Sequence, residues 1–203
     1  MLLRAIATFV NFVMRGAVFL AIAVLGGFGS AWVMIHSGSQ LTAATAGPWV
    51  TWTAAGRMDA DPYTRAHTVR LGLLPLNSTL ALTYQAQTDG TGQRIHSSCV
   101  YVVDVSDLNA EWWSLAVFDD RGGLIRNNAN RFAFNSSTVL RDADGGTRIV
   151  IAREARPGNW LPTAGAGRLI LSLTVQDPRW VSAAVAEQGR SRTLPVISTV
   201  SCR

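Results

Sequence analysis

The chain contains no lysine. All 18 basic residues among its 203 residues are arginines. Without lysine the chain cannot form a Schiff base through a side-chain amine, a Ser-Lys catalytic dyad or the lysine-dependent phosphate loop of nucleotide hydrolases. These three classes of active site are therefore excluded.

Residues that bind metals are also scarce. The three histidines, His36, His67 and His96, form neither an HxH nor an HExxH spacing. The two cysteines, Cys99 and Cys202, lie far apart and are too few for a structural zinc site. We therefore expect no metal and no other cofactor.

The usual catalytic arrangements are missing as well. Asp119 and Asp120 are adjacent, so on extended chain their carboxylates point apart and cannot flank a glycosidic bond as a pair. No serine lies in a GxSxG sequence. The sequence favours a non-catalytic protein, and an enzyme acting on carbohydrate or lipid-linked envelope substrates stays as the alternative.

The net charge is positive but thinly spread. The net charge is +5, and two of the arginines, Arg4 and Arg15, lie close to the N-terminus, before any acidic residue. The remainder of the chain carries no basic patch of the kind that binds nucleic acid. A nucleic-acid partner is therefore not expected.

One long apolar run is present near the N-terminus. Residues 16–35 carry no charge, and as a helix they span about 30 Å, the thickness of the hydrocarbon core of a bilayer. Arg4 and Arg15 precede the run, and the next charged residue is Arg57, so the positive-inside rule places the N-terminus in the cytoplasm. We predict a transmembrane anchor over residues 1–36, embedded through residues 16–35 in the bacterial inner membrane, with the rest in the periplasm.

Two alternatives to a retained anchor stay open. A cleaved signal peptide is one, because residues 44–46, ATA, fit a cleavage site and cleavage would fall near Ala46. The apolar run is longer than most signal sequences and ends well before that site. The other alternative is a buried helix of a soluble protein.

The location beyond the membrane predicts a disulfide between Cys99 and Cys202, because thiols in the periplasm can be oxidised. The alternative is two free buried thiols. Such a bond closes a loop of roughly 100 residues, which is worth about 4 to 5 kcal/mol in the chain-entropy model.

The rest of the chain predicts one β domain. Residues 37–47 are small and polar and are expected to form a flexible stalk, followed by a β-sandwich over residues 48–203. Asp61 and Pro62 predict the start of one amphipathic helix with Pro62, Ala66, Val69 and Leu73 on one face. Alternating apolar residues then predict antiparallel strands around these positions: Leu80 to Tyr84, Cys99 to Val105, Ile149 to Ile151 and Leu169 to Val175.

The densest stretch of the chain is residues 111–132, EWWSLAVFDDRGGLIRNNANRF. Residues 112–118 are apolar at nearly every position, which predicts a central strand buried on both faces. The glycines of DDRGG permit a turn, and asparagines tolerate the irregular backbone that follows.

This stretch resembles the signature of domain-of-unknown-function family 1214, which has a WWS strand, a D-x-x-G turn, an L-I-x-N step and an N-R-aromatic step. The later GNWLPTAGAGRLILSLTVQDP and the earlier DADPYTRA also fit, so the resemblance covers about residues 50–178. It implies a jelly-roll-like β-sandwich, often found C-terminal to a domain of family 1254. Here a short membrane-anchored form has an anchor in that place. The resemblance implies no catalytic residues.

Candidate ligand-binding residues follow from side-chain chemistry alone. An arginine offers a planar fork for a carboxylate or phosphate, asparagines both donate and accept hydrogen bonds, and an exposed tryptophan can stack on a sugar or headgroup. The candidates are Arg131, Asn127, Asn128, Asn130 and Trp160. The competing interpretation is structural, with a buried Arg131 paired to Asp119 or Glu154 and the asparagines holding the backbone.

These observations together predict a membrane-anchored periplasmic β-sandwich protein. Its expected role is to bind another envelope protein or a small polar ligand.

Overall fold

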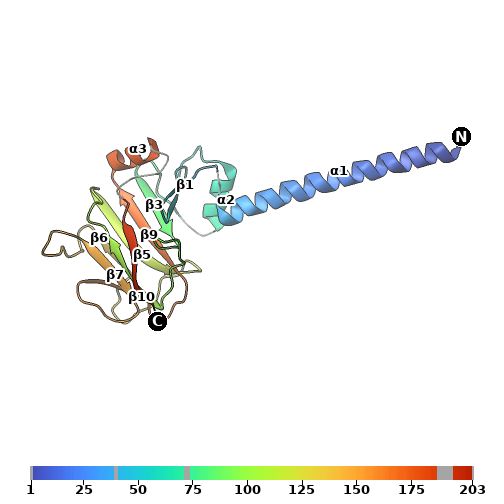
Figure 1. Cartoon of the computed structure of the whole chain (residues 1–203). Helices are drawn as coiled ribbons and strands as arrows, with labels where there is room; N and C mark the ends of the chain where they lie inside the picture. The colour runs from blue at the N-terminus through green and yellow to red at the C-terminus, as the bar shows by residue number, and fades with distance from the viewer. Residues whose placement is uncertain (1, 39–40, 71–73, 187–193, 203) are drawn as a thin grey trace.

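The computed structural model describes residues 2–38, 41–70, 74–186 and 194–202. A long helix, α1 (Leu2–Ser37), projects from a β domain (Figure 1). The other elements in chain order are β1 (Ala43–Ala46), β2 (Trp49–Trp52), α2 (Pro62–Arg70), β3 (Ala81–Ala86), β4 (Cys99–Asp104), β5 (Trp112–Asp119), β6 (Ala133–Asn135), β7 (Arg148–Ala152), β8 (Asn159–Pro162), β9 (Leu169–Gln176), α3 (Pro178–Ala186) and β10 (Val196–Cys202).

The domain has two sheets. The six-stranded sheet has the order β1-β2-β3-β9-β5-β6, and the four-stranded sheet has the order β10-β4-β7-β8. All pairs are antiparallel except β7 with β8, which is parallel. The mainly β fold is confirmed, and the expectation of purely antiparallel pairing is wrong for this one pair.

The core lies between the two sheets and is built by residues of period two. Strand β3 contributes Leu82 and Tyr84, and β9 contributes Leu171 and Leu173, all with at most 1 % of their surface exposed. The facing sheet contributes residues of the same kind: Tyr101, Val103, Ile149 and Ile151. The predicted alternation is therefore confirmed for these strands, because one face of each strand is buried and the other is not.

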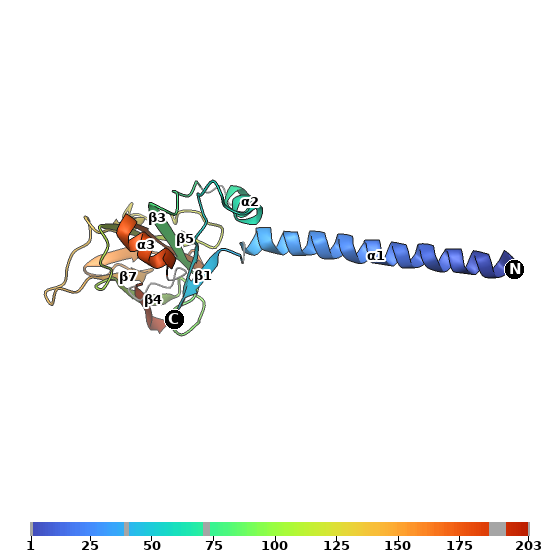
Figure 2. The same ribbon diagram turned by 90° about the horizontal axis from the view of Figure 1, so that it is seen from above.

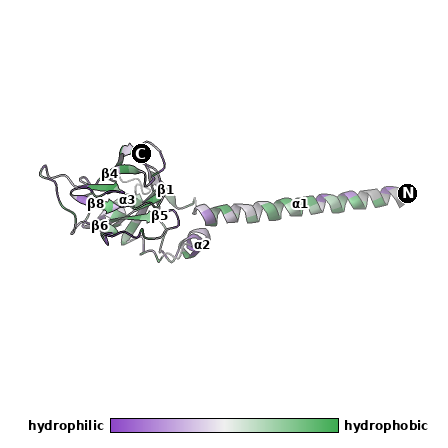
Figure 3. Cartoon of the chain, turned by 90° about the horizontal axis from the view of Figure 1, so that it is seen from below, coloured by the Kyte–Doolittle hydropathy of each residue, from purple (hydrophilic) through white to green (hydrophobic). Residues whose placement is uncertain are grey.

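Helix α1 is apolar on all sides and packs on the β domain only near its end. Figure 3 shows apolar residues around its circumference. Its segment Phe9–Ser37 is long and apolar enough to cross a membrane, and none of the most apolar part is buried within the protein. Phe12 and Phe28, for example, are each 76 % exposed. A helix apolar on every face is typical of a lipid environment.

The expected stalk over residues 37–47 is wrong in part. Residues Ala43–Ala46 form β1, which pairs with β2 in the register Ala43↔Trp52 to Ala46↔Trp49. Small side chains do not prevent a strand from pairing when the neighbouring strand offers free backbone groups. The domain therefore begins at β1, close to the end of α1.

Helix α2 starts as predicted but buries a different face. The Asp61 side chain accepts hydrogen bonds from the backbone N–H groups of Tyr63 and Thr64, each 3.0 Å long, and so caps the helix. The buried residues are Thr64 and His67, whereas Val69 is 77 % exposed. Leu73 lies outside the described residues. The expected apolar stripe is wrong because α2 packs through polar groups that hydrogen-bond to backbone and side-chain oxygens.

A further helix, α3, was not expected. Asp177 caps it by accepting hydrogen bonds from the N–H groups of Arg179 and Trp180. Val181 and Ala184 are buried, and Trp180 packs edge-on against Tyr84 with ring centroids 5.9 Å apart. The helix therefore covers one end of the core (Figure 2).

Strand β5 is buried on one face only. Trp113, Leu115 and Val117 lie in the core, while Trp112 and Phe118 are half-buried on the outer face. The expected burial on both faces is therefore wrong. The outer face of the six-stranded sheet is only partly covered, since α2 lies over some of its strands.

The last strand, β10, is fixed to the domain by covalent and polar contacts. Cys202 and Cys99 form a disulfide across the β10–β4 pair. Thr199 on β10 donates a hydrogen bond to the buried carboxylate of Asp89. Gly90 donates a backbone hydrogen bond of 2.9 Å to the carbonyl of Ile197. These bonds join β10 to the turn before β4.

Candidate functional site

The asparagine-rich turn is held together by hydrogen bonds between the Asn127 side chain and the backbone of the turn. Asn127 donates from Nδ2 to the carbonyl oxygens of Ile125 and Arg131, at 3.0 and 2.9 Å, and accepts from the N–H of Arg131. Asn130 has a φ of 48°, a left-handed conformation that asparagine tolerates better than most residues. Asn128 is exposed. Asn127 therefore acts as a scaffold for the turn.

Arg131 is exposed, not buried. Its Nη1 donates to the carbonyl oxygen of Trp160 at 3.3 Å, and its guanidinium lies 5.4 Å from the centre of the Phe134 ring. The indole N–H of Trp160 donates to the carbonyl of Ala152 at 3.0 Å. The structure thus brings Asn127, Arg131 and Trp160 to one corner of the domain, where their polar groups bind backbone.

The two aspartates of the preceding turn are also structural in part. Asp119 accepts from the N–H groups of Arg121 and Gly123, at 2.9 and 2.7 Å, and so closes the turn after β5. Asp120 is exposed and lies beside the turn. In residues 119–131, the side chains of Asp119 and Asn127 therefore serve to hold the backbone of the turns that follow β5.

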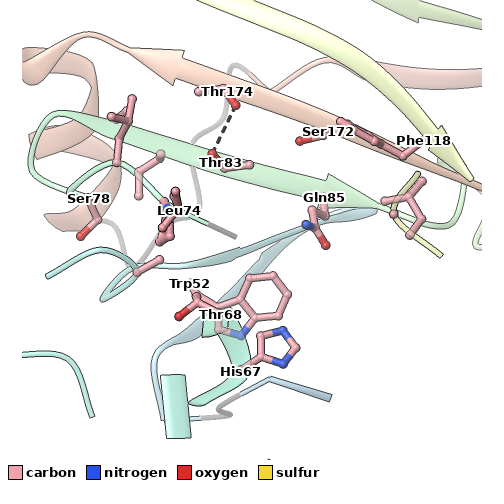
Figure 4. Close-up of a pocket in the computed structure, with 17 residues that line it drawn as sticks. Trp52, His67, Thr68, Leu74, Ser78, Thr83, Gln85, Phe118, Ser172 and Thr174 are labelled. Carbon is pink, nitrogen blue, oxygen red and sulfur yellow. Dashed lines mark hydrogen bonds between the residues drawn. The ribbon is translucent and has the colours of Figure 1, made fainter. Parts of the chain in front are cut away.

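A groove of about 330 Å³ lies elsewhere, on the outer face of the six-stranded sheet (Figure 4). Strands β3 and β9 form its floor, and α2, β2 and the segment 74–78 form the opposite wall. Its volume falls at the lower end of the range for small-molecule sites. None of the residues nominated from the sequence lines this groove.

The floor carries short polar side chains in register. Thr83 pairs with Thr174 and Gln85 with Ser172 across the β3–β9 ladder. The two threonine hydroxyls lie 3.2 Å apart, as the dashed line in Figure 4 shows. Further along the sheet the floor becomes apolar at Phe118 and Ile170. The floor therefore offers a few hydroxyl and amide groups within an apolar surface.

The wall connects the groove to the end of α1. His67 contacts the carbonyl oxygen of Ile35 through Nδ1 at 2.8 Å, and its ring packs on Trp52 with centroids 5.2 Å apart. Gly38 has a φ of +86° and lies against the indole ring of Trp52. A Cβ at this position would come within 2.5 Å of Trp52 Nε1. Trp52 Nε1 is buried and has no hydrogen-bond partner among the residues that the structure describes. His67 and Trp52, which contact the end of α1, therefore also line the groove.

The groove is electrically neutral. Among the described residues that line it, His67 is the one with a titratable side chain, and no carboxylate or guanidinium faces the cavity. The structure also contains no cluster of three or more metal-ligating side chains within the residues it describes. The arrangement suits an uncharged and largely apolar molecule, because a charged one would lose its hydration without gaining a counter-ion.

The carboxylates Asp89 and Asp177, whose pKa values are both lowered, lie outside the groove. Burial disfavours the charged form of Asp89, but hydrogen bonds from Thr199, Thr91 and Gln93 outweigh it and lower the pKa of this carboxyl to about 2. The N–H of Trp180 and, to a smaller extent, those of Glu111 and Arg179 lower the pKa of Asp177. Both groups stabilise turns and helix ends. Asp89 also lines a second cavity, beside Thr91 and Thr199, whose hydroxyls donate to its carboxylate.

Sequence reasoning missed the groove because its residues come from distant segments. The signal that was available is the polar face of β9, where Ser172 and Thr174 alternate with buried leucines. That pattern indicates a surface but does not show what lies over it.

Two solved structures show similarity to this chain. The VPA0106 protein from Vibrio parahaemolyticus is 24% identical, has a TM-score of 0.55 and aligns over 70% of this chain and 36% of its own. A putative uncharacterized protein from Burkholderia cenocepacia is 16% identical, with a TM-score of 0.37, over 72% of this chain and 46% of its own. The chain thus spans less than half the length of either protein. No curated protein matches it.

A family model, described as "Protein of unknown function (DUF1214)", matches residues 80–180. The match begins later than the expected residue 50, and it includes the WWS strand, the asparagine-rich turn and β9. Residues 80–180 therefore form a domain of the DUF1214 family.

Proposed function

We propose that this chain is a non-catalytic binding protein, anchored in the bacterial inner membrane by α1, with its β domain in the periplasm. The domain binds an uncharged, largely apolar small molecule in the groove over β3 and β9. The observation that carries the proposal is the neutral lining of that groove beside the end of an apolar helix.

Three features support the topology. Arg4 and Arg15 precede the uncharged run, and no charged residue follows it until Arg57. The Cys99–Cys202 disulfide is typical of an oxidising compartment. Cleavage near Ala46 would remove β1 from the six-stranded sheet, which favours a retained anchor.

The lining also argues for the class of ligand and against catalysis. His67 Nδ1 is engaged with the Ile35 carbonyl, and no described carboxylate in the groove can act as its partner. General acid–base chemistry needs a positioned pair of such groups. The small polar ligand expected from the sequence does not suit the groove, since its few hydroxyls are surrounded by apolar side chains.

Reporter fusions test the topology. Alkaline phosphatase fused after Arg203 should be active, because the enzyme folds only outside the cytoplasm. A cytoplasmic reporter at the same point should be inactive. The reverse pattern would contradict the proposed orientation.

Native mass spectrometry of the detergent-solubilised full chain tests the groove, with dodecanol as an uncharged probe. One dodecanol should bind per chain. Ser172→Trp fills the groove and should abolish binding. Ser114→Trp is the matched control, because Ser114 lies on the same outer face of β5 but does not line the groove. Equal binding by both variants would contradict the proposal.

A further inference from the structure

We infer that the natural occupant of the groove is an acyl chain of an anionic phospholipid from the outer leaflet of the same membrane. This inference rests on the proposed function and names the ligand. It follows from the position of the groove, the apolar rim beside it and the charge of α2.

The groove lies at the level of the bilayer surface. Ile35 is the last residue of the uncharged run, and its carbonyl contacts His67, which lines the groove. Helix α2 lies against the end of α1 in both Figure 1 and Figure 2. Trp32, one turn before His36, is 65 % exposed and suits the interfacial belt of aromatic residues. When residues 16–35 cross the bilayer, the α2 wall of the groove meets the headgroups.

The rim near α2 is apolar and exposed. Val69 on α2 is 77 % exposed, and Leu74 and Leu76, which line the groove, are 97 % and 53 % exposed. In water such side chains would be unfavourable as a group, and beside a bilayer they can enter the acyl region. They provide an apolar path from the leaflet into the cavity.

The charge beside this rim favours an anionic headgroup. Helix α2 contains Arg65 and Arg70 and no acidic residue between Pro62 and Arg70. Arg70 is exposed next to Val69 and contacts Nε2 of His36 at 2.7 Å. A phosphate at the bilayer surface would thus meet arginine, while its acyl chain occupies the neutral cavity. One molecule satisfies both the charged rim and the uncharged interior.

Photo-crosslinking in vesicles tests this inference. Benzoyl-phenylalanine replaces Phe118, which lines the groove on the sheet side, away from Leu74 and Ser78 in Figure 4. The same replacement at Trp112 is the control, because Trp112 is half-buried on the same face of β5 and does not line the groove. The full chain is reconstituted in vesicles of phosphatidylglycerol and phosphatidylethanolamine, irradiated and weighed by mass spectrometry.

The expected product is a one-to-one phosphatidylglycerol adduct at position 118, at least fivefold more abundant than at position 112. Adding Ser172→Trp should remove it. Leu74→Asp and Arg70→Gln, both at exposed positions, should each reduce it severalfold. Equal adducts at 118 and 112, or equal adducts with phosphatidylcholine vesicles, would overturn the inference. Absence of any lipid adduct while dodecanol still binds would overturn the lipid assignment alone. Loss of dodecanol binding as well would overturn the proposed function.

Discussion

The Nδ1 atom of His67 lies 2.8 Å from the carbonyl oxygen of Ile35, 32 residues earlier in the chain. The last four carbonyls of a helix have no partner within it, and Ile35 is among them because α1 ends at Ser37. His67 therefore caps α1 from α2 and fixes the domain to the end of the helix. Since a carbonyl only accepts, Nδ1 carries the proton.

Replacing this residue should loosen the junction. His67→Ala leaves the Ile35 carbonyl without its partner and removes the ring that packs on Trp52, so we expect a loss of about 1 to 3 kcal/mol. For a chain of this size this corresponds to a fall in melting temperature of roughly 2 to 12 °C. Arg65→Ala, at an exposed position of the same helix, is the control for thermal melts in detergent. Equal melting of the two variants would show that the contact contributes nothing.

The two adjacent tryptophans of β5 should differ strongly. Trp113 is 5 % exposed within the core, so Trp113→Ala should cost about 3 to 5 kcal/mol, which can unfold a marginal domain. Trp112 is half-buried on the outer face, so Trp112→Ala should cost clearly less. Denaturant unfolding of both variants measures the difference. A similar cost for both would contradict the one-sided burial of β5.

The disulfide should be formed in the isolated protein. Mass spectrometry of the unreduced chain should show the loss of two hydrogens and no alkylatable thiol. Cys99→Ser with Cys202→Ser should lower stability by about 4 to 5 kcal/mol, because the bond closes a loop of 103 residues. Two free thiols in the isolated protein would argue against an oxidising compartment.

Asp89 should make stability depend on acid pH. Its pKa is lowered from 3.8 to about 2 in the folded chain, so the carboxylate stabilises the fold above pH ~4 and this contribution is lost as the pH falls towards 2. In Asp89→Asn the contribution is absent at every pH. The difference in melting temperature between the two proteins should therefore be largest above pH ~4 and shrink towards pH ~2. A difference that stays constant across this range would refute the assignment.

Arg131 should prove to be structural. Its guanidinium binds the Trp160 carbonyl and lies over Phe134, so Arg131→Ala should lower stability by about 1 kcal/mol. Retention of dodecanol in the groove should be unchanged, because Arg131 does not line it. Thermal melts with a panel of anionic sugars examine the competing hypothesis. An unchanged melting temperature with loss of stabilisation by one of these sugars would establish a ligand site at this corner.

Where local chemistry was decisive, the sequence predicted the structure well. The period-two residues of β4 and β9 are buried as expected, and Asp61 caps α2 because an aspartate before proline can accept the free N–H groups of a helix start. The same Asp-Pro signal at Asp177 and Pro178 predicts α3 equally well, and it was overlooked.

Features that depend on contacts between distant segments of the chain could not be predicted from the sequence. Residues 43–46 are small, three alanines and one threonine, and only the position of β2 makes them a strand. The buried face of α2 depends on the carbonyl of Ile35 and on Thr42, which accepts or donates a hydrogen bond to Thr64 at 2.8 Å. The groove arises where α2 and the segment 74–78 pass over β3 and β9, and its composition follows from that packing alone.

The short segment between α1 and β1 limits how far from the membrane the domain can encounter a ligand. Five residues, 38–42, separate Ser37 from Ala43, and even fully extended they reach about 18 Å. With α1 in a bilayer, the domain stays within a thin layer above the lipids and does not reach molecules deeper in the compartment. Occupancy then follows the number of ligands per unit area of membrane, and encounter rates follow lateral diffusion in two dimensions.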